Sequence, residues 1–169
     1  DSHASIVYGG IIGRAENRAL VSSLEMQLSQ VDKISWDGVD AVALIDTQIG
    51  ASNHARPPQL PIVAVFDHHQ FRRSPQRARY RDVRPGYGAT STILTEYLVA
   101  AEMQPPSQLA TALFYGIKTD TRGLARDACD CDAWAYMVLL GLMDPKLLAK
   151  IEQARVPRSY FKAFNDTLA

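Results

Sequence analysis

Apolar residues in the first half of the chain fall into short continuous runs, each bounded by turn-forming or charged residues. Uninterrupted apolar runs of about four to eight residues are typical of strands that are buried on both faces of a parallel sheet. The clearest run covers residues 62–66, and residues 40–46 form a second one. These two runs and a shorter one predict strands at 5–8, 40–46 and 62–66. Residues 80–83, closed by Pro85-Gly86, are interpreted as another short strand.

Elsewhere the apolar residues recur at helical spacing. One such segment, 16–28, lies between the first two predicted strands. The remaining segments occupy the second half, where they predict helices at 92–101, 108–118, 132–142, 145–153 and 158–168. Strands connected by helical stretches and then a run of helices predict an α/β fold. We expect a Rossmann-like, mostly parallel sheet flanked by helices, with a helical C-terminal half.

Charge changes this picture only locally. The 169 residues include 18 basic and 18 acidic side chains, so the net charge of zero gives no overall attraction to nucleic acid or membranes. Arginines nevertheless follow one another closely after the run at 62–66, at Arg72, Arg73, Arg77, Arg79, Arg81 and Arg84. This stretch suits an anionic substrate, for which Arg84 is a candidate contact. A solvated arginine-rich loop is the alternative interpretation.

The two cysteines, Cys129 and Cys131, are separated by one residue, a spacing that disfavours a disulfide between them. A lone C-x-C pair is also a weak signal for zinc. Free thiols suit a reducing compartment. The sequence has no apolar run of membrane-spanning length and no leader-like first segment. We therefore expect a cytoplasmic protein with no membrane partner.

Candidate chemistry lies at the ends of the predicted elements. Asp67, His68 and His69 directly follow the run at 62–66, and Asp46 closes the run at 40–46. Open α/β sheets bind ligands at the carboxyl ends of their strands. Asp120 follows the predicted helix 108–118. Each acidic residue taken singly also fits a turn or a helix cap, so the hypothesis of a site depends on their conjunction.

Carboxylates combined with an imidazole, and without thiolates, are ligands that suit Mn²⁺, with Mg²⁺ as the second choice. Many phosphatases and nucleases use a carboxylate to bridge two such ions about 3.5–4 Å apart, which activate water and neutralise phosphoryl charge. Thr90 and Ser91 stand just before the predicted helix 92–101. They are interpreted first as helix-start hydroxyls and second as contacts to phosphate through backbone N–H groups.

These residues make the chain resemble the DHH phosphoesterase superfamily. Asp67-His68-His69 resembles the motif that names the family, the segment 43–48 resembles its second motif, and the segment 115–121 its fourth. The segment 88–98 resembles the helix between the third and fourth motifs. The superfamily includes single-strand exonucleases of the RecJ type, nano-RNases that also dephosphorylate 3′-phosphoadenosine 5′-phosphate, cyclic-dinucleotide phosphodiesterases and manganese-dependent pyrophosphatases. The wording of the fourth motif is most similar to the nano-RNase and phosphatase branch.

The resemblance implies a role for each motif residue. Asp46 would be the carboxylate shared by two metal ions, and His68 and Asp120 would complete the shell of the second ion. His69 would face the substrate phosphate, while Asp67 would orient the histidines. The resemblance thus implies a metal-dependent phosphoesterase that acts on short single-stranded oligonucleotides or on nucleoside bisphosphates, with a metal-activated water as nucleophile.

The chain departs from the family at both ends. Family members begin with a strand that ends in a His-x-x-x-Asp-x-Asp motif, and they carry a small C-terminal companion domain; neither is recognisable here. We therefore expect residues 1–169 to be a DHH-type domain that is incomplete at its N-terminus. Loss of a central strand would expose a sheet edge and invite homo-oligomerisation. The alternative function is a non-catalytic module that binds nucleotides or a partner with only part of the metal site.

Two other enzyme classes are disfavoured. No G-x-G-x-x-G fingerprint follows the first predicted strand, which argues against a dinucleotide-dependent oxidoreductase. No G-x-S-x-G motif is present to indicate a serine nucleophile.

Overall fold

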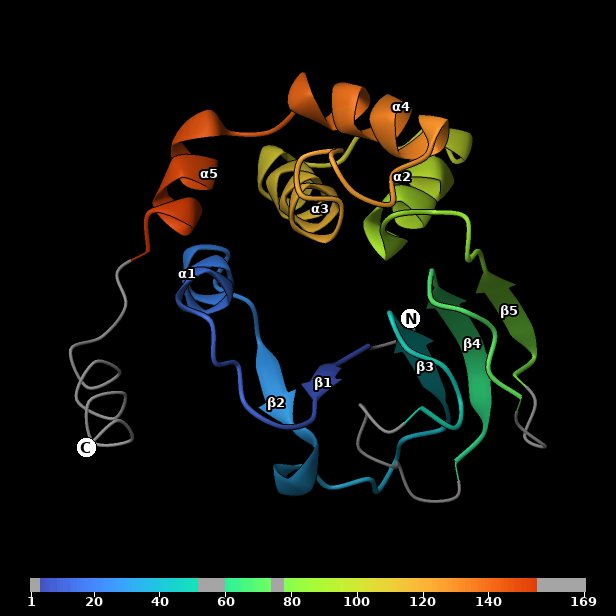
Figure 1. Ribbon diagram of the computed structural model, residues 1–169. Helices are drawn as coiled ribbons and strands as arrows, with labels where there is room; N and C mark the ends of the chain where they lie inside the picture. Colours follow the sequence, from blue (N-terminus) through green and yellow to red (C-terminus); the bar gives the residue numbers. More distant parts are fainter. Residues whose placement is uncertain (1–3, 52–59, 74–77, 155–169) are drawn as a thin grey trace, which may run out of the picture.

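The computed structural model describes residues 4–51, 60–73 and 78–154. Strands dominate the first half of these residues and helices the second (Figure 1). In chain order the elements are β1 (Ile6–Tyr8), α1 (Ala15–Ser23), β2 (Leu28–Gln30), η1 (Val31–Lys33), β3 (Val42–Ile45), β4 (Ile62–Asp67), β5 (Tyr80–Val83), α2 (Thr90–Ala100), α3 (Ser107–Asp120), α4 (Asp130–Leu140) and α5 (Pro145–Glu152). The expected α/β fold with parallel sheets and a helical C-terminal half is confirmed.

The strands form two parallel sheets. One has the order β3-β4-β5, and the other pairs β1 with β2. In the larger sheet Ile45 lies beside Phe66, so β3 and β4 end next to each other. Both strands point their carboxyl ends toward α2 and α3 (Figure 1). The residues that directly follow β3 and β4 therefore meet at one edge of the sheet, below the helices.

The predicted helix at 16–28 is wrong in its last turn. Helix α1 ends at Ser23, the chain turns through Glu25 with a positive φ of 50°, and Leu28 begins β2. Leu28 pairs with Ile6 of β1. The spacing from Leu24 to Leu28 fits a helix, but pairing with a distant strand decided the outcome, and local periodicity does not report such a contact.

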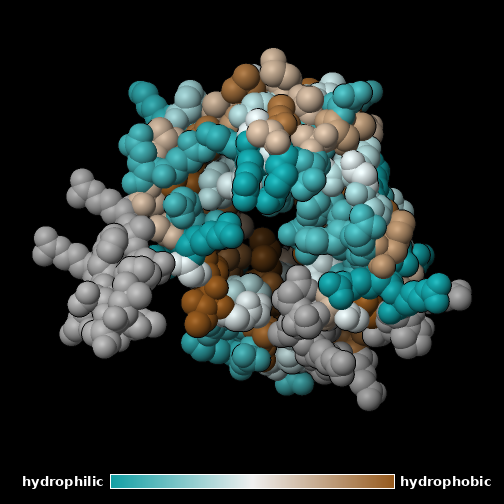
Figure 2. All heavy atoms as spheres, in the orientation of Figure 1, coloured by the Kyte–Doolittle hydropathy of each residue, from teal (hydrophilic) through white to brown (hydrophobic). Residues whose placement is uncertain are grey.

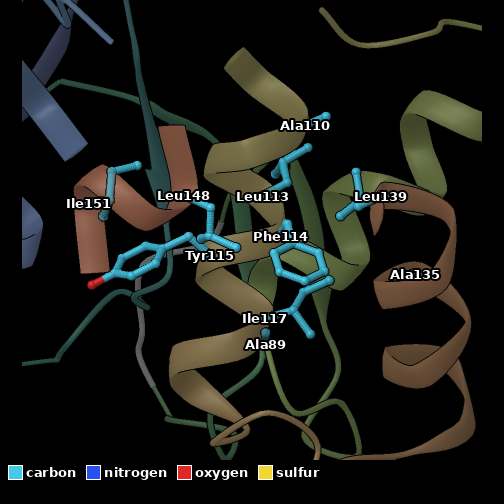
Figure 3. Close-up of a cluster of buried hydrophobic side chains, with 10 residues drawn as sticks. All are labelled: Ala89, Ala110, Leu113, Phe114, Tyr115, Ile117, Ala135, Leu139, Leu148 and Ile151. Atoms are coloured by element: carbon cyan, nitrogen blue, oxygen red, sulfur yellow. The ribbon is translucent and has the colours of Figure 1, made fainter. Parts of the chain in front are cut away.

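The larger core lies among the helices. Helix α3 runs through its centre, where Leu113, Phe114 and Ile117 are buried (Figure 3). Helix α4 contributes Ala135 and Leu139 from one side, and α5 contributes Leu148 and Ile151 from the other: the full cluster is Ala89, Ala110, Leu113, Phe114, Tyr115, Ile117, Ala135, Leu139, Leu148 and Ile151. This cluster fixes the position of the end of α3, where Asp120 is the last helical residue.

The strands bury much less. Their cluster consists of Leu44, Ile62 and Val65. In the part of the chain that the structure describes, β1 pairs only with β2 and β3 only with β4, so each keeps one free edge. Ile6 and Ile45 are 55% and 50% exposed. Figure 2 shows a hollow between the helices and the strands with apolar residues on its floor. The expected loss of a central strand, and the oligomerisation that it would invite, stay predictions.

None of the helices within the described residues is long and apolar enough to cross a membrane. The helix predicted at 158–168 lies outside the described residues, as does Arg77 of the arginine-rich stretch.

Candidate metal centre

The candidate centre begins at Asp46, the first residue after β3. Its backbone N–H donates to the carbonyl oxygen of Phe66 at 2.8 Å, which extends the parallel ladder by one bond. Asp46 then turns into the left-handed region with φ 60°. This conformation is uncommon for a residue other than glycine, and such strained residues cluster at functional sites. The turn leaves the carboxylate half exposed beside the end of β4.

Three side chains meet here. A carboxylate oxygen of Asp46 and one ring nitrogen each of His68 and His69 all lie within 4.8 Å of one another. Nε2 of His68 is 3.5 Å from Oδ1 of Asp46, and the two imidazole rings are 4.4 Å apart between centroids. The structure thus brings together the expected pair Asp46 and His68, with His69 as the third member of the group.

Each imidazole is oriented by an oxygen at its Nδ1 atom. Nδ1 of His68 is 3.2 Å from the carbonyl oxygen of Tyr87, and since that oxygen only accepts, Nδ1 carries the proton. Nδ1 of His69 donates to Oδ1 of Asp67 at 2.8 Å. Both rings therefore keep Nε2 for another partner. An N–H held by a carbonyl or carboxylate oxygen behind the ring is the usual arrangement for histidines that bind a metal.

Asp67 is buried beneath the histidines and fully engaged. Besides His69, its carboxylate accepts from the backbone N–H of His68 at 3.0 Å and from the amide of Gln48 at 2.7 Å. Burial pushes the pKa of Asp67 upward, but the hydrogen bonds from His69 and Gln48 outweigh it, so the net pKa is lowered. The hydrogen bond between His69 and Asp67 also raises the pKa of His69. Asp67 is thus an ionised residue that positions its neighbours.

Asp46 is held by Thr90. The hydroxyl of Thr90, at the first turn of α2, donates to Oδ1 of Asp46 at 2.7 Å. Thr90 itself is buried. One oxygen of Asp46 is therefore anchored to the helical half. The sequence pointed to Thr90 first as a helix-start hydroxyl, and the structure has Thr90 as the first residue of α2 with its side chain on the neighbouring carboxylate. A phosphate contact through its backbone N–H stays a prediction.

Asp120 approaches the group from α3. The pKa of Asp120 is raised, mainly by burial and also by the negative charge of Asp46. His68 and His69 lower this pKa, but by less. The carboxyl of Asp120 therefore lies within electrostatic range of the other three residues. It does not belong to the tight group of ligating atoms formed by Asp46, His68 and His69. A cation between them would relieve the repulsion between the two carboxylates.

The other two predicted substrate contacts are engaged within the fold. Arg84 forms ion pairs with Asp82 and Glu96 and a 3.0 Å hydrogen bond to the hydroxyl of Tyr87. Ser91 faces α3, because a Cβ atom placed on Gly116 would lie 2.2 Å from its Oγ. These contacts tie β5 to α2 and α2 to α3.

Sequence reasoning missed three residues that shape the centre. Gln48 stood inside the second motif, but nothing local indicated that its amide would reach the next strand end. Tyr87 acts through its backbone carbonyl, which any residue could supply. Asp132 was interpreted only as the start of a helix.

Asp132 fastens the loop that carries Tyr87. Its fully buried carboxylate accepts from the backbone N–H of Gly88 and that of Cys129, both at 2.8 Å, and from the hydroxyl of Thr92. Burial pushes the pKa of Asp132 up, and these hydrogen bonds bring it below its ordinary value. The residue thus connects α4 to the start of α2, between the carbonyl that orients His68 and the hydroxyl that holds Asp46.

The donor set fits a divalent cation. Two imidazole nitrogens and carboxylate oxygens, without thiolate, suit Mn²⁺, Mg²⁺ or another ion that accepts nitrogen and oxygen ligands. Each histidine presents the nitrogen that its own hydrogen bond leaves available. Asp46, His68 and His69 could therefore hold one metal ion, with Asp120 close by.

Comparison with known proteins finds a related sequence. The chain is 38% identical over 154 residues to an uncharacterised protein of Methanocaldococcus jannaschii, a match that covers 90% of this chain and 31% of that protein. The chain therefore spans about a third of the length of the curated relative it matches. A scan against models of known protein families found no match.

Two solved structures share the arrangement of elements. A Methanococcus jannaschii protein assigned to the family II inorganic pyrophosphatases superposes with a TM-score of 0.66 at 15% identity, covering 83% of this chain and 50% of that one. An exopolyphosphatase-related protein from Bacteroides fragilis superposes with a TM-score of 0.56 at 13% identity, covering 96% and 59%. Such identities show the fold alone. The expected resemblance is confirmed at the level of the fold: the chain shares the fold of these two proteins, and it carries an Asp/His group suited to a metal ion.

Proposed function

We propose that this chain is the core of a metal-dependent phosphoesterase that hydrolyses short single-stranded oligonucleotides or nucleoside bisphosphates. The observation that carries the proposal is the convergence of Asp46, His68 and His69 at the ends of two adjacent parallel strands. Such strand ends are where open α/β sheets bind their ligands. Mn²⁺ is the proposed ion, with Mg²⁺ as second choice, because the donors are nitrogen and oxygen atoms only.

The residues divide the work as follows. Asp46 and His68 hold the ion, and Asp120 supplies a further carboxylate from α3. His69 faces the substrate phosphate, where the raised pKa of its imidazole favours a donated hydrogen bond or a positive charge. Asp67 fixes the ring of His69. When bound, the divalent ion lowers the pKa of a water molecule toward neutrality and offsets negative charge on the phosphoryl oxygens.

A metal titration tests the first step of the proposal. Mn²⁺ binding to the chain is measured by calorimetry and by the electron paramagnetic resonance signal of free Mn²⁺. Asp46→Asn and His68→Ala should each abolish binding. Asp32→Asn, which removes an exposed carboxylate of η1, is the matched control and should bind as the unchanged protein does.

Hydrolysis is best tested on the full-length parent protein, since the chain spans only part of its relatives. We expect Mn²⁺-dependent release of mononucleotide or phosphate that is lost in Asp46→Asn. Unchanged turnover in Asp46→Asn and His68→Ala would refute the proposal.

A non-catalytic module is the second candidate, and one observation favours it. Within the described ranges, a single group of three ligating side chains is gathered, which suffices for one ion. Two-metal phosphoesterases hold a pair of ions. If the parent protein binds Mn²⁺ and nucleotide through these residues but releases no product, the binding module replaces the enzyme.

A further inference from the structure

An exposed aromatic ring stands beside the candidate centre. Phe71 follows His69 by two residues, so the two Cα atoms are at most about 7 Å apart. Its side chain is 64% exposed, the largest exposed fraction of any phenylalanine in the described part of the chain. A single exposed ring is ordinary on a protein surface. What separates Phe71 from such cases is how it is fixed and what surrounds it.

Arg81 of β5 lies over the ring of Phe71. Its guanidinium carbon is 5.4 Å from the ring centroid, a cation–π distance. The same guanidinium donates to Oε1 of Gln48 at 2.9 Å, and the backbone N–H of Arg72 donates to that oxygen at 3.1 Å. The amide of Gln48 thus fixes both sides of the pair.

Gln48 also links this pair to the candidate centre. It is only 2% exposed, and its NH₂ group donates to Asp67, the residue that orients His69. The aromatic ring and the phosphate-facing histidine are therefore held by one buried amide. A loop held in this way presents an imidazole and an aromatic ring at a set separation. A ligand with an anionic part and a planar part could contact both.

The surroundings of Phe71 are basic. Arg72, Arg73 and Arg79 are exposed near it in the sequence, together with Arg81. The net charge of the whole chain is zero, so this concentration of positive charge is local. Exposed aromatic rings combined with arginines are the means by which proteins bind single-stranded nucleic acid: bases stack on the rings, and the arginines attract the phosphates.

We propose that Phe71 and Arg81 form a base-stacking subsite that lets the centre select phosphoesters carrying a nucleobase over inorganic phosphate chains. This inference rests on the proposed function and deepens it, because it names the residues through which the centre would recognise the nucleobase of such substrates. The two solved structures with this fold are assigned to or related to enzymes of inorganic phosphates, so the fold by itself does not make this choice. In this chain the loop after His69 would provide the selectivity for nucleobase-carrying phosphoesters.

Equilibrium binding of two ligands to the full chain tests the subsite without metal or turnover. The ligands are the 5′-phosphorylated dinucleotide pApA and inorganic tripolyphosphate, titrated by calorimetry at low salt. Phe71→Ala should weaken pApA binding about tenfold, the effect of removing one stacked base, and leave tripolyphosphate binding unchanged. Phe71→Tyr keeps the ring and should bind pApA as the unchanged protein does.

A matched control and a direct readout separate stacking from a structural effect. Trp134→Ala removes another exposed aromatic side chain, on α4, and should change neither affinity. In protein labelled with 4-fluorophenylalanine, the ¹⁹F signal that disappears in Phe71→Tyr belongs to Phe71. It should shift with pApA and stay in place with tripolyphosphate.

Three results would overturn the subsite: unchanged pApA affinity in Phe71→Ala, equal losses for both ligands, or no binding of pApA at all. None of them depends on Mn²⁺ or hydrolysis. A protein that binds pApA through Phe71 but fails the Mn²⁺ tests would refute the proposed function and keep the subsite. A protein that hydrolyses phosphoesters without a role for Phe71 would do the reverse.

Discussion

The helical half and the strand half of this molecule are built on unequal amounts of buried surface. Helices α2 to α5 enclose a continuous apolar cluster around α3, in which Ile117 and Leu139 are fully buried. The strands enclose a small cluster around Val65 and leave Ile6 and Ile45 half exposed at free edges. Burial of apolar surface is the main driving force of folding, so the helical half supplies more of the stability.

The candidate centre lies across the boundary between these halves. The strand half supplies Asp46, His68 and His69, and the helical half supplies the groups that hold two of them. Thr90 at the start of α2 binds Asp46, and the carbonyl of Tyr87 orients His68. We therefore infer that the more stable helical half holds in position the metal-ligand side chains that the less stable sheet carries.

Truncating one buried side chain in each half is the strongest test of the difference in stability between the halves. Phe114→Ala should lower the free energy of unfolding by about 4 kcal/mol, because it opens a cavity in the helical core, where the ring of Phe114 packs 4.2 Å from that of Tyr136 between centroids. Leu44→Ala in the small strand cluster should cost about 2 kcal/mol, the lower end of the range for such changes. Urea denaturation measures both. Leu109→Ala, at an exposed position of α3, is the control. Equal costs at Phe114 and Leu44 would contradict the comparison.

Removing the buried carboxylate of Asp132 should loosen the connection between the halves. Asp132→Ala leaves the N–H groups of Gly88 and Cys129 without acceptor and should cost about 3 kcal/mol. If the candidate centre binds Mn²⁺, affinity should also fall about tenfold, as for residues that support metal ligands. Asp132→Asn keeps an oxygen for both N–H groups and should restore binding.

Thr111→Ala provides the control for Asp132. It removes a buried hydroxyl near the start of α3, far from Asp120 along the helix, that accepts from the backbone N–H of Asp144. This variant should lose stability but keep Mn²⁺ affinity. A parallel loss of affinity in both variants would show that general destabilisation, and not the loop at Gly88, weakens the centre.

Close packing of α2 on α3 gives a third test, of intermediate size. A Cβ atom on Gly116 would lie 2.2 Å from Oγ and 3.2 Å from Cβ of Ser91, so Gly116→Ala should cost about 2 kcal/mol by overpacking. Ser91→Gly should recover most of that loss in the double variant. Gly13→Ala meets open space and should stay within about 0.5 kcal/mol of the unchanged protein. Additive losses at Gly116 and Ser91 would exclude this contact as the cause.

The pH dependence of stability gives the smallest effect. The pKa of Asp132 is lower in the folded chain than its ordinary value of 3.8, so its contribution is fully present above about pH 5 and is lost as the pH falls through the folded pKa. Each unit of lowering is worth about 1.4 kcal/mol. Asp67 and Asp82, whose pKa values are also lowered, lose stability in the same window. Between pH 6 and about pH 2.5 the free energy of unfolding should therefore fall less in Asp132→Asn than in the unchanged protein. An equal fall in both proteins would contradict the role of the Asp132 charge.

The sequence by itself determined most of the elements, though not β2, and the outline of the centre. Apolar runs located β3 and β4, although the structure leaves Ala43 and Ile45 of β3 exposed. A strand buried on both faces would need uninterrupted apolar residues, and β3 is buried only in part. The parallel arrangement then required Asp46 and His68, at two strand ends, to meet. Both inferences use only local patterns and one rule of sheet topology. The helix predicted at 158–168 is outside what the structure describes.

Tertiary structure decided everything that depends on contacts between distant residues. Thr90 reaches Asp46 across 44 positions and Asp132 reaches Thr92 across 40, and no periodicity within either segment reports such a pairing. The same holds for Leu28, which left a helical pattern to pair with β1. His69 belongs to the tight group because its ring is oriented by Asp67, which Gln48 holds in turn, and the sequence shows neither hydrogen bond. Local patterns place residues on elements, and only the packed chain fixes which atoms face one another.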